Sequence, residues 1–203
     1  MGRLVLASTS PRRRELLGVL GLPFEVAPSD FDESSIPVGA LQPGAWVMRL
    51  AEGKARAVAA RTEGDAVVIG ADTTVVLEGE YLNKPQDDDD ARRMLRRLGG
   101  QTHTVYTGLC LAETRNGRLV RVATDFAQTG VTFAPLSEAV IEAYVATGEP
   151  RDKAGAYGIQ GKALAFIPGI EGDYFNVVGL PVFLLCRMLE PWGISPWQPH
   201  APD

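Results

Sequence analysis

Residues 4–17 read LVLASTSPRRRELL, and this stretch predicts how the fold begins. Its first four residues form a short apolar run that is typical of a buried strand. Ser10 and Pro11 follow as a helix N-cap and a proline at the first helical position, so a helix is expected until Gly21. A strand followed by a turn and a helix is a common opening of a sheet that helices cover.

Three arginines, Arg12 to Arg14, occupy the first turn of this helix. The helix dipole disfavours positive charge there by roughly 0.3–1 kcal/mol for each exposed residue. The free N–H groups of a first turn that follows a strand also bind anions, and arginine side chains strengthen such a site. A phosphate-binding turn is therefore one interpretation, and arginines that simply reach solvent or acidic neighbours are the other.

Hydrophobic periodicity predicts the remaining elements. A strand is expected over residues 66–71, where the apolar run ends in Asp72, and a hairpin over residues 74–82. A second hairpin is expected to turn at Asn116-Gly117, and its second strand to run to residue 133 with a bend near Ala127. Four segments share the helical period: 45–61, 87–98, 137–146 and 180–189. The fold class is therefore α/β, a mixed sheet flanked by helices, with loops at 28–44 and 147–161.

Length and charge exclude several classes of protein. The chain has 203 residues and a net charge of −5, which fits one domain of moderate size, with at most a small second lobe. The negative charge argues against binding to a nucleic acid polymer or to an anionic membrane, and no apolar run is long enough to span one. The two cysteines, Cys110 and Cys186, lie in apolar stretches and predict buried thiols and a cytoplasmic location.

The segment 87–98 carries four aspartates in its first turn and four arginines toward its end. Aspartates in such number invite a metal-site interpretation. Capping and complementarity with the helix dipole already explain both groups of charges, so a solvated helix is expected.

Asp72 is expected at the carboxyl end of a strand, where α/β sheets place their ligands. With the hydroxyls of Thr73 and Thr74 beside it, its carboxylate can hold Mg²⁺ or accept a proton from water, and it can also simply cap the hairpin turn. Residues 148–161 contain four glycines, which allow a ligand to approach the backbone closely. Tyr157 and Gln160 could contact a nucleobase there, but the segment taken alone is better explained as a plain irregular loop.

Six segments of the chain form a pattern when taken together in order. They read LASTSPRRRELL, GADT, KP, QTHTVYTG, GEPRDKAGAYGIQG and GDYFNVVGLP, at residues 6–17, 70–73, 84–85, 101–108, 148–161 and 172–181. This pattern resembles the Maf (septum formation) family of nucleoside triphosphate pyrophosphatases. The resemblance implies a Maf/ITPase-like fold of two lobes with a cleft between them. Residues 1–190 would then form a single domain and residues 191–203 a peripheral tail, and the resemblance also suggests a homodimer.

The family resemblance implies hydrolysis of a nucleoside triphosphate to its monophosphate and pyrophosphate, with Mg²⁺ or Mn²⁺. The YGIQ form of residues 157–160 is similar to the subgroup that acts on dTTP and UTP. Asp72 would activate water and hold the metal with Glu33, although Asp30 and Asp32 are neighbouring acids. Three residues would set substrate preference: Arg12, Thr73 and Gln160. Five would contact phosphate: Ser8, Arg13, Lys54, Lys84 and Lys153. Gly53 departs from the pattern, since a helix former is expected before Lys54.

Other functions fit the same residues. A regulator of cell division could bind a nucleotide in this site without hydrolysing it, and release of pyrophosphate would separate the two. A phosphatase that releases orthophosphate is a second alternative, which analysis of the products would identify. Removal of modified pyrimidine nucleotides is a third, physiological interpretation of the same chemistry.

Overall fold

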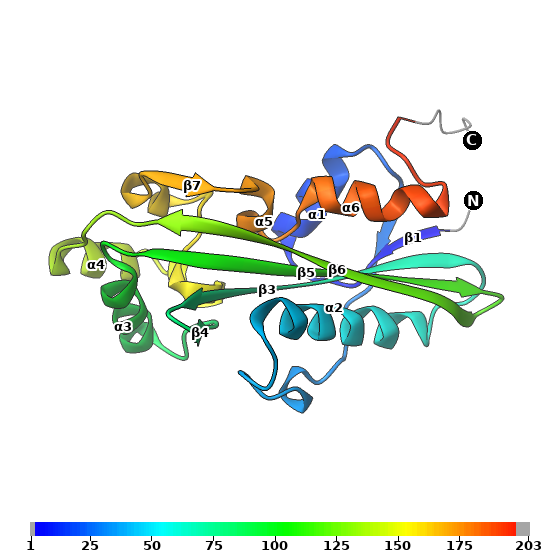
Figure 1. Ribbon diagram of the computed structural model, residues 1–203, viewed down its shortest axis with the longest axis horizontal. Helices are drawn as coiled ribbons and strands as arrows, with labels where there is room; N and C mark the ends of the chain where they lie inside the picture. The colour runs from blue at the N-terminus through cyan, green and yellow to red at the C-terminus, as the bar shows by residue number, and fades with distance from the viewer. Residues whose placement is uncertain (1–2, 198–203) are drawn as a thin grey trace.

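Three long antiparallel strands form the spine of the molecule. The computed structural model describes residues 3–197. In it β3 (Ala66–Leu77), β5 (Thr102–Arg115) and β6 (Arg118–Thr132) run along most of the length of the molecule (Figure 1). β5 and β6 are joined by the turn expected at Asn116-Gly117, where both residues have the positive φ that such a turn requires.

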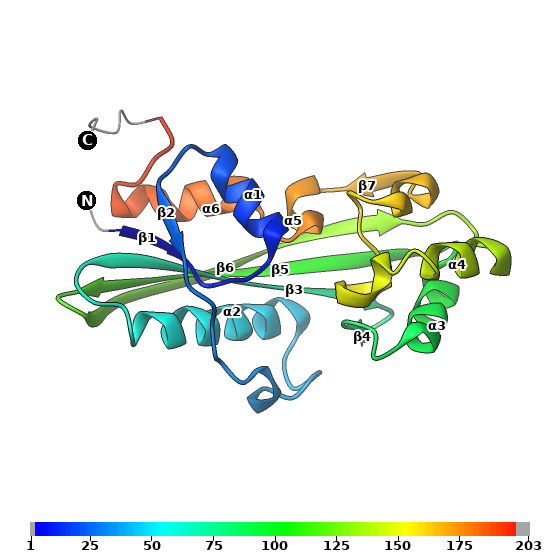
Figure 2. The ribbon, with the colours of Figure 1, turned by 180° about the vertical axis from the view of Figure 1, so that it is seen from behind.

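The amino-terminal part of the chain extends the sheet on the free side of β3. β1 (Arg3–Leu6) lies parallel between β3 and β2 (Phe24–Val26), and α1 (Pro11–Val19) connects the two short strands. α1 and α6 (Val182–Leu189) cover one face of the sheet, and α2 (Pro43–Ala59) covers the other (Figures 1 and 2). Helices on both faces of a mixed sheet confirm the α/β fold class.

The other end of the sheet has its own hydrophobic core. β4 (Glu80–Leu82) pairs with β3, while α3 (Asp88–Leu98) and α4 (Glu138–Val145) pack together beside it. β7 (Gly169–Glu171) pairs with the end of β6, and α5 (Tyr174–Val178) follows it. Two ends with separate cores agree with the expectation of two lobes.

α2 lies unusually close to the sheet because β3 has a glycine at position 70. A Cβ atom on Gly70 would collide with the carbonyl oxygen of Ala51 and the Cβ atom of Ala55, both in α2. The two alanines are fully buried, so small residues on both sides make this approach possible. Lys54 of α2 and Asp72 of β3 are thereby brought within reach of each other.

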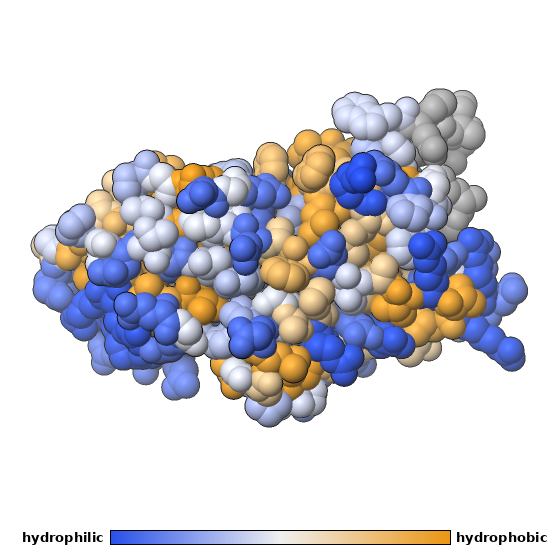
Figure 3. All heavy atoms as spheres, in the orientation of Figure 1, coloured by the Kyte–Doolittle hydropathy of each residue, from blue (hydrophilic) through white to orange (hydrophobic). Residues whose placement is uncertain are grey.

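α3 confirms the interpretation of its charges as those of a capped, solvated helix. The side chain of Asp87 accepts a hydrogen bond from the backbone nitrogen of Asp90 at 2.8 Å. Arg92 and Arg96 form ion pairs with acidic residues of α4. Hydrophilic residues gather at this end of the molecule (Figure 3).

Two sequence-based expectations about the strands are wrong. β3 does not end at Asp72 but continues for five residues, since residues 73–76 are β-branched and β5 stays paired with them throughout. The register of β6 is regular around Ala127, and its irregularity lies instead at Val120, which has no partner between Glu113 and Thr114 of β5. The segments β2, β7 and α5 were not expected because three to five residues are too few to display a period.

The described part of the expected tail is partly packed. Ile194 is 6% exposed and lies in the same hydrophobic cluster as Leu189 of α6. Residues 198–203 of that tail lie outside the described residues. Cys110 is buried as expected, whereas Cys186 is only half-buried, and both are free thiols. No helix within residues 3–197 is long and apolar enough to cross a membrane.

His103 makes the stability of this fold depend on pH. The ring is 2% exposed and its Nε2 atom lies 2.8 Å from the hydroxyl of Tyr157, and burial lowers the pKa of His103 to about 4. The unfolded chain binds a proton near pH 6.5 that the folded chain binds only near pH 4, so the free energy of unfolding falls as pH falls through this window. Between pH 7 and pH 5, we expect wild type to lose about 2 kcal/mol more than His103→Gln in urea denaturation. Equal losses in the two proteins would contradict this account.

Candidate active site

The edge of β3 is open over a short stretch in the middle of the sheet. β1 pairs with β3 as far as Leu6, which lies opposite Ile69. Farther along β3, pairing with β4 starts only at Val75, which lies opposite Leu82, the last residue of β4. Within residues 3–197, no strand covers this edge from residue 70 to residue 74. β3 continues across the opening because β5 pairs with its other edge throughout.

A cavity of about 1130 Å³ occupies this opening. Its walls come from the first turn of α1, the loop before α2, α2 itself, β3 and the glycine-rich segment. All ten residues expected in the site line it: Ser8, Arg12, Arg13, Glu33, Lys54, Asp72, Thr73, Lys84, Lys153 and Gln160. Thr74 is not among the lining residues, and its hydroxyl instead donates to the side chain of Asn83 at 2.8 Å.

Lys54 joins two carboxylates at the floor of the cavity. Its Nζ atom lies 2.5 Å from Oδ1 of Asp72 and 2.9 Å from Oε1 of Glu33. Asp72 is 7% exposed, and burial raises the pKa of its carboxyl group, while Lys54 and Arg13 partly oppose that rise. A buried carboxylate with a raised pKa is suited to accept a proton from water.

Gly53, the departure noted in the sequence, has a structural reason. A Cβ atom at this position would collide with the ring of Phe31, which comes from the loop before α2. The ring therefore packs directly on the helix backbone, two residues before Glu33 in the chain. This contact holds the loop against α2 at the position where Glu33 meets Lys54.

Arg13 is a half-buried cation that neutral groups hold. Its Nε atom donates to the carbonyl oxygen of Gly179 at 2.8 Å, and its Nη2 atom donates to the hydroxyl of Thr73 at 3.0 Å. Its Nη1 atom lies 3.4 Å from the hydroxyl of Ser8. Burial lowers the pKa of Arg13, and no carboxylate within residues 3–197 forms an ion pair with it. The guanidinium group therefore retains its charge for an anionic ligand.

The other expected cations lie around the rim. Arg12 pairs with Asp152 at 3.4 Å, and Lys153 pairs with the same carboxylate at 2.6 Å. Lys84 is exposed and forms no ion pair with any residue from 3 to 197. Ser10 caps α1 as expected, because its hydroxyl accepts from the backbone nitrogen of Arg13 at 3.4 Å.

Tyr157 and Gln160 of the glycine-rich segment, residues 148–161, were both expected to contact a base, and only one of them is placed to do so. Gln160 is exposed at the cavity and makes no side-chain hydrogen bond among the described residues. Tyr157, by contrast, is 5% exposed, packs edge-on against Phe133 and bonds to His103, so it offers no open face on which a base could stack.

The two carboxylates around Lys54 fit a divalent cation. Asp72 and Glu33 already share one positive group and supply the hard oxygen ligands that Mg²⁺ and Mn²⁺ prefer. Mg²⁺ commonly takes one or two protein carboxylates and completes its ligands with water and substrate phosphates. Asp30 and Asp32 are occupied elsewhere, with Arg61 and with the Ser34 amide. No cluster of three or more His, Cys, Asp or Glu residues within 3–197 could hold a metal.

Two residues that support the site were not singled out from the sequence. Thr107 and Asn176 are fully buried and bond to the groups that hold Arg13. Both lie in segments quoted for the family resemblance, but a buried polar residue behind a cavity leaves no local pattern that would identify it.

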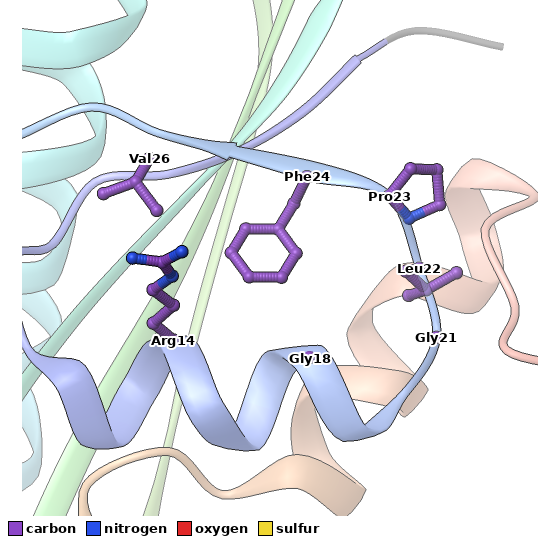
Figure 4. Close-up of a pocket in the computed structure, with 7 residues that line it drawn as sticks. All are labelled: Arg14, Gly18, Gly21, Leu22, Pro23, Phe24 and Val26. Carbon is purple, nitrogen blue, oxygen red and sulfur yellow. The ribbon is translucent and has the colours of Figure 1, made fainter.

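A second hollow lies between α1 and β2, with a volume of about 620 Å³. Figure 4 shows Arg14 of α1 beside Phe24 and Val26 of β2. Arg14 is the only charged residue among those that line it, and no carboxylate is present. This hollow therefore lacks the groups that hydrolysis requires.

Comparison with known proteins agrees with these features. A family model described as Maf-like protein matches residues 3–192. The dTTP/UTP pyrophosphatase of Moorella thermoacetica is 54% identical over 197 residues, which cover 97% of this chain and 98% of that protein. The dTTP/UTP pyrophosphatase of Symbiobacterium thermophilum is 52% identical over 193 residues, 95% of each chain.

Among solved structures, the Ham1 protein of Staphylococcus aureus overlaps with a TM-score of 0.46 at 13% identity. The overlap covers 94% of this chain and 99% of that chain, and it is too loose to carry an argument. The family model, in contrast, spans almost the whole length, and relatives more than half identical extend over the same residues. The chain therefore belongs to the Maf family.

Proposed function

We propose that this protein is a dTTP/UTP pyrophosphatase, which hydrolyses a nucleoside triphosphate to its monophosphate and pyrophosphate. The observation that carries the proposal is the buried Asp72 carboxylate in the floor of a cavity that also gathers Arg12, Arg13, Lys54 and Lys153. The names of relatives about half identical over nearly the whole chain support the same activity.

In this proposal Asp72 acts as the general base. Water loses a proton to the Asp72 carboxylate as the water oxygen attacks the α phosphorus. The bond from the α phosphorus to the oxygen that bridges it to the β phosphorus then breaks. Pyrophosphate then leaves with the bridging oxygen. Hydrolysis of a phosphoanhydride needs little covalent assistance, so positioning and charge neutralisation contribute most of the rate. The site requires no covalent nucleophile.

The cations would bind the triphosphate. Arg13 has its charge unpaired, and Lys84 is exposed at the rim, so both can meet phosphate without first breaking an ion pair. Arg12 and Lys153 share the carboxylate of Asp152, which is itself exposed, so a polyanion can compete with it for both cations. Ser8 also lines the cavity and would contact a phosphate.

A divalent cation, Mg²⁺ or Mn²⁺, is part of the proposal, and Asp72 and Glu33 would hold it. Bound there, it would neutralise negative charge on the phosphates. Gln160 would hydrogen-bond the edge of the base, while Arg12 and Thr73 would contribute to substrate preference. Support for the role of Gln160 comes from its free amide at the cavity wall.

The remaining parts of the proposal concern the whole protein. We propose a cytoplasmic homodimer in which residues 1–190 form the catalytic domain. A nucleotide-sensing regulator of cell division is the alternative, but a buried base with a raised pKa has no use in a protein that only binds.

Replacing Asp72 by asparagine tests the activity. We expect Asp72→Asn to bind dTTP about as well as wild type, because the cations remain. Its release of pyrophosphate should fall by roughly 10²–10⁴-fold, since the base is lost. Wild-type kcat/KM should also fall as pH is lowered through the raised pKa of Asp72, and the residual activity of the variant should lack this decline. Asp89→Asn, on the exposed surface of α3, is the matched control. Undiminished pyrophosphate release by Asp72→Asn would refute the proposal.

Substrate preference tests the role of Gln160. In a panel of nucleoside triphosphates with Mg²⁺ or Mn²⁺, we expect dTTP and UTP to give the highest kcat/KM. Gln160→Ala should lower the ratio of kcat/KM for dTTP to that for dGTP by about threefold to tenfold, the worth of one hydrogen bond. Gln101→Ala, outside the cavity, serves as the control. A wild-type preference for purines, or an unchanged ratio in Gln160→Ala, would contradict this assignment.

A further inference from the structure

Two of the family segments supply the cavity with no polar side chain. Residues 101–108 contribute only Val105 to its lining, and residues 172–181 contribute Val177, Val178 and Gly179. Their polar residues Thr107 and Asn176 are instead fully buried behind the wall. The proposed function leaves both of them without a task.

These buried residues determine where the Arg13 guanidinium lies. Arg13 has three contacts, to Gly179, Thr73 and Ser8, and all three acceptors are uncharged. A guanidinium group without a carboxylate partner is oriented by the hydrogen bonds that it donates, because no ion pair fixes it. Anything that holds Gly179 and Thr73 in place therefore holds Arg13.

Thr107 fixes the direction of the hydrogen bond at Thr73. The Thr107 hydroxyl donates its single proton to the carbonyl oxygen of Asn176 at 3.0 Å. The Thr73 hydroxyl lies 2.9 Å from that of Thr107, so Thr73 must be the donor of this bond. The lone pairs of Thr73 are then directed to accept from Nη2 of Arg13, at 3.0 Å.

Asn176 holds the other acceptor. Its Nδ2 atom donates to the carbonyl oxygen of Val105 at 3.0 Å and to the hydroxyl of Thr129 at 2.9 Å, which ties α5 to β5 and β6. The backbone carbonyl oxygen of Asn176 accepts a hydrogen bond from the backbone nitrogen of Gly179 at 3.0 Å. The next group along the chain is the Gly179 carbonyl, which accepts from Nε of Arg13.

Stability alone does not account for Asn176. Its Oδ1 atom is buried and has no hydrogen-bond partner among residues 3–197, and an unpaired buried acceptor costs free energy of folding. A residue that keeps one unpaired polar atom buried behind a ligand cavity is better explained by what it positions there.

We propose that Thr107 and Asn176 are positioning residues, which hold Arg13 in the orientation that binds phosphate. Neither touches the substrate; each acts through Arg13, by way of Thr73 or Gly179. The inference rests on the proposed function in one respect, namely that Arg13 contacts a phosphate.

A double-mutant cycle tests this coupling. Thr107→Val removes the hydroxyl and keeps the shape, so Thr73 loses its acceptor and no longer presents its lone pairs to Arg13. We expect kcat/KM for dTTP and affinity for inorganic pyrophosphate to fall by about tenfold to hundredfold, the worth of a charged hydrogen bond. On an Arg13→Ala background, the same substitution should change either quantity by less than about twofold.

Two further variants separate positioning from a structural role. Thr107→Ser keeps the hydroxyl and should restore both quantities to within about threefold of wild type. Thr102→Val removes one hydroxyl of another threonine pair: Thr102 lies on the same strand as Thr107, and its hydroxyl is 2.9 Å from that of Thr132 in β6, outside the cavity. This variant should leave both quantities unchanged. Thermal melting identifies any variant that fails to fold. If Thr107→Val fails to fold, Thr107→Ala takes its place in the test, because it removes the hydroxyl without adding a methyl group.

Each outcome decides whether Thr107 acts through Arg13. Three results would overturn this role. Thr107→Val could cause the same loss with Arg13 present as in the Arg13→Ala protein, it could cause no loss at all, or Thr107→Ser could lose as much as Thr107→Val. A wild-type chain that releases no pyrophosphate from dTTP would refute the proposed function instead. Titration with inorganic pyrophosphate would then still decide whether Thr107 acts through Arg13.

Discussion

The close packing of α2 against Gly70 is the constraint on which the site depends. Because a side chain at position 70 would collide with Ala51 and Ala55, only glycine lets the helix lie this near to β3. Lys54, the next polar residue along that helix face, then reaches Asp72. β1 pairs with β3 only up to Ile69 and β4 only from Val75, so the edge of β3 is open where Asp72 meets Lys54. The same packing thus supports the sheet and places a charged group in the floor of the cavity.

The net charge of −5 conceals an uneven distribution. Acids are concentrated on α3 and α4, where they cap a helix or pair with arginines at the surface, and such exposed pairs contribute little to stability. Within the cavity the balance is reversed, because Arg13 has no acidic partner and Lys84 no ion pair among residues 3–197. An acidic protein can therefore contain a site of the right charge and size for a triphosphate, while long polyanions meet a surface that repels them.

Much of this architecture could be predicted from local sequence. Patterns only a few residues long predict three of its parts. These are the turn at Asn116-Gly117, the capped helix α3, and the strand and helix on either side of Ser8. The extent of β3 could not be predicted in this way, because an aspartate inside a strand reads as its end unless the partner strand is known. Local pattern also does not separate Glu33 from its acidic neighbours, and only the family resemblance indicated it. In the structure Glu33 reaches Lys54 where Phe31 packs on Gly53.

The central claim is that water cleaves the bond between the α and β phosphates. The most direct measurement is the identity of the products when the purified protein is incubated with dTTP and Mg²⁺ or Mn²⁺ and the mixture is followed by phosphorus NMR. We expect dTMP and pyrophosphate in equal amounts from the first turnover, with no orthophosphate. Orthophosphate together with dTDP, or binding of dTTP without any product, would contradict it.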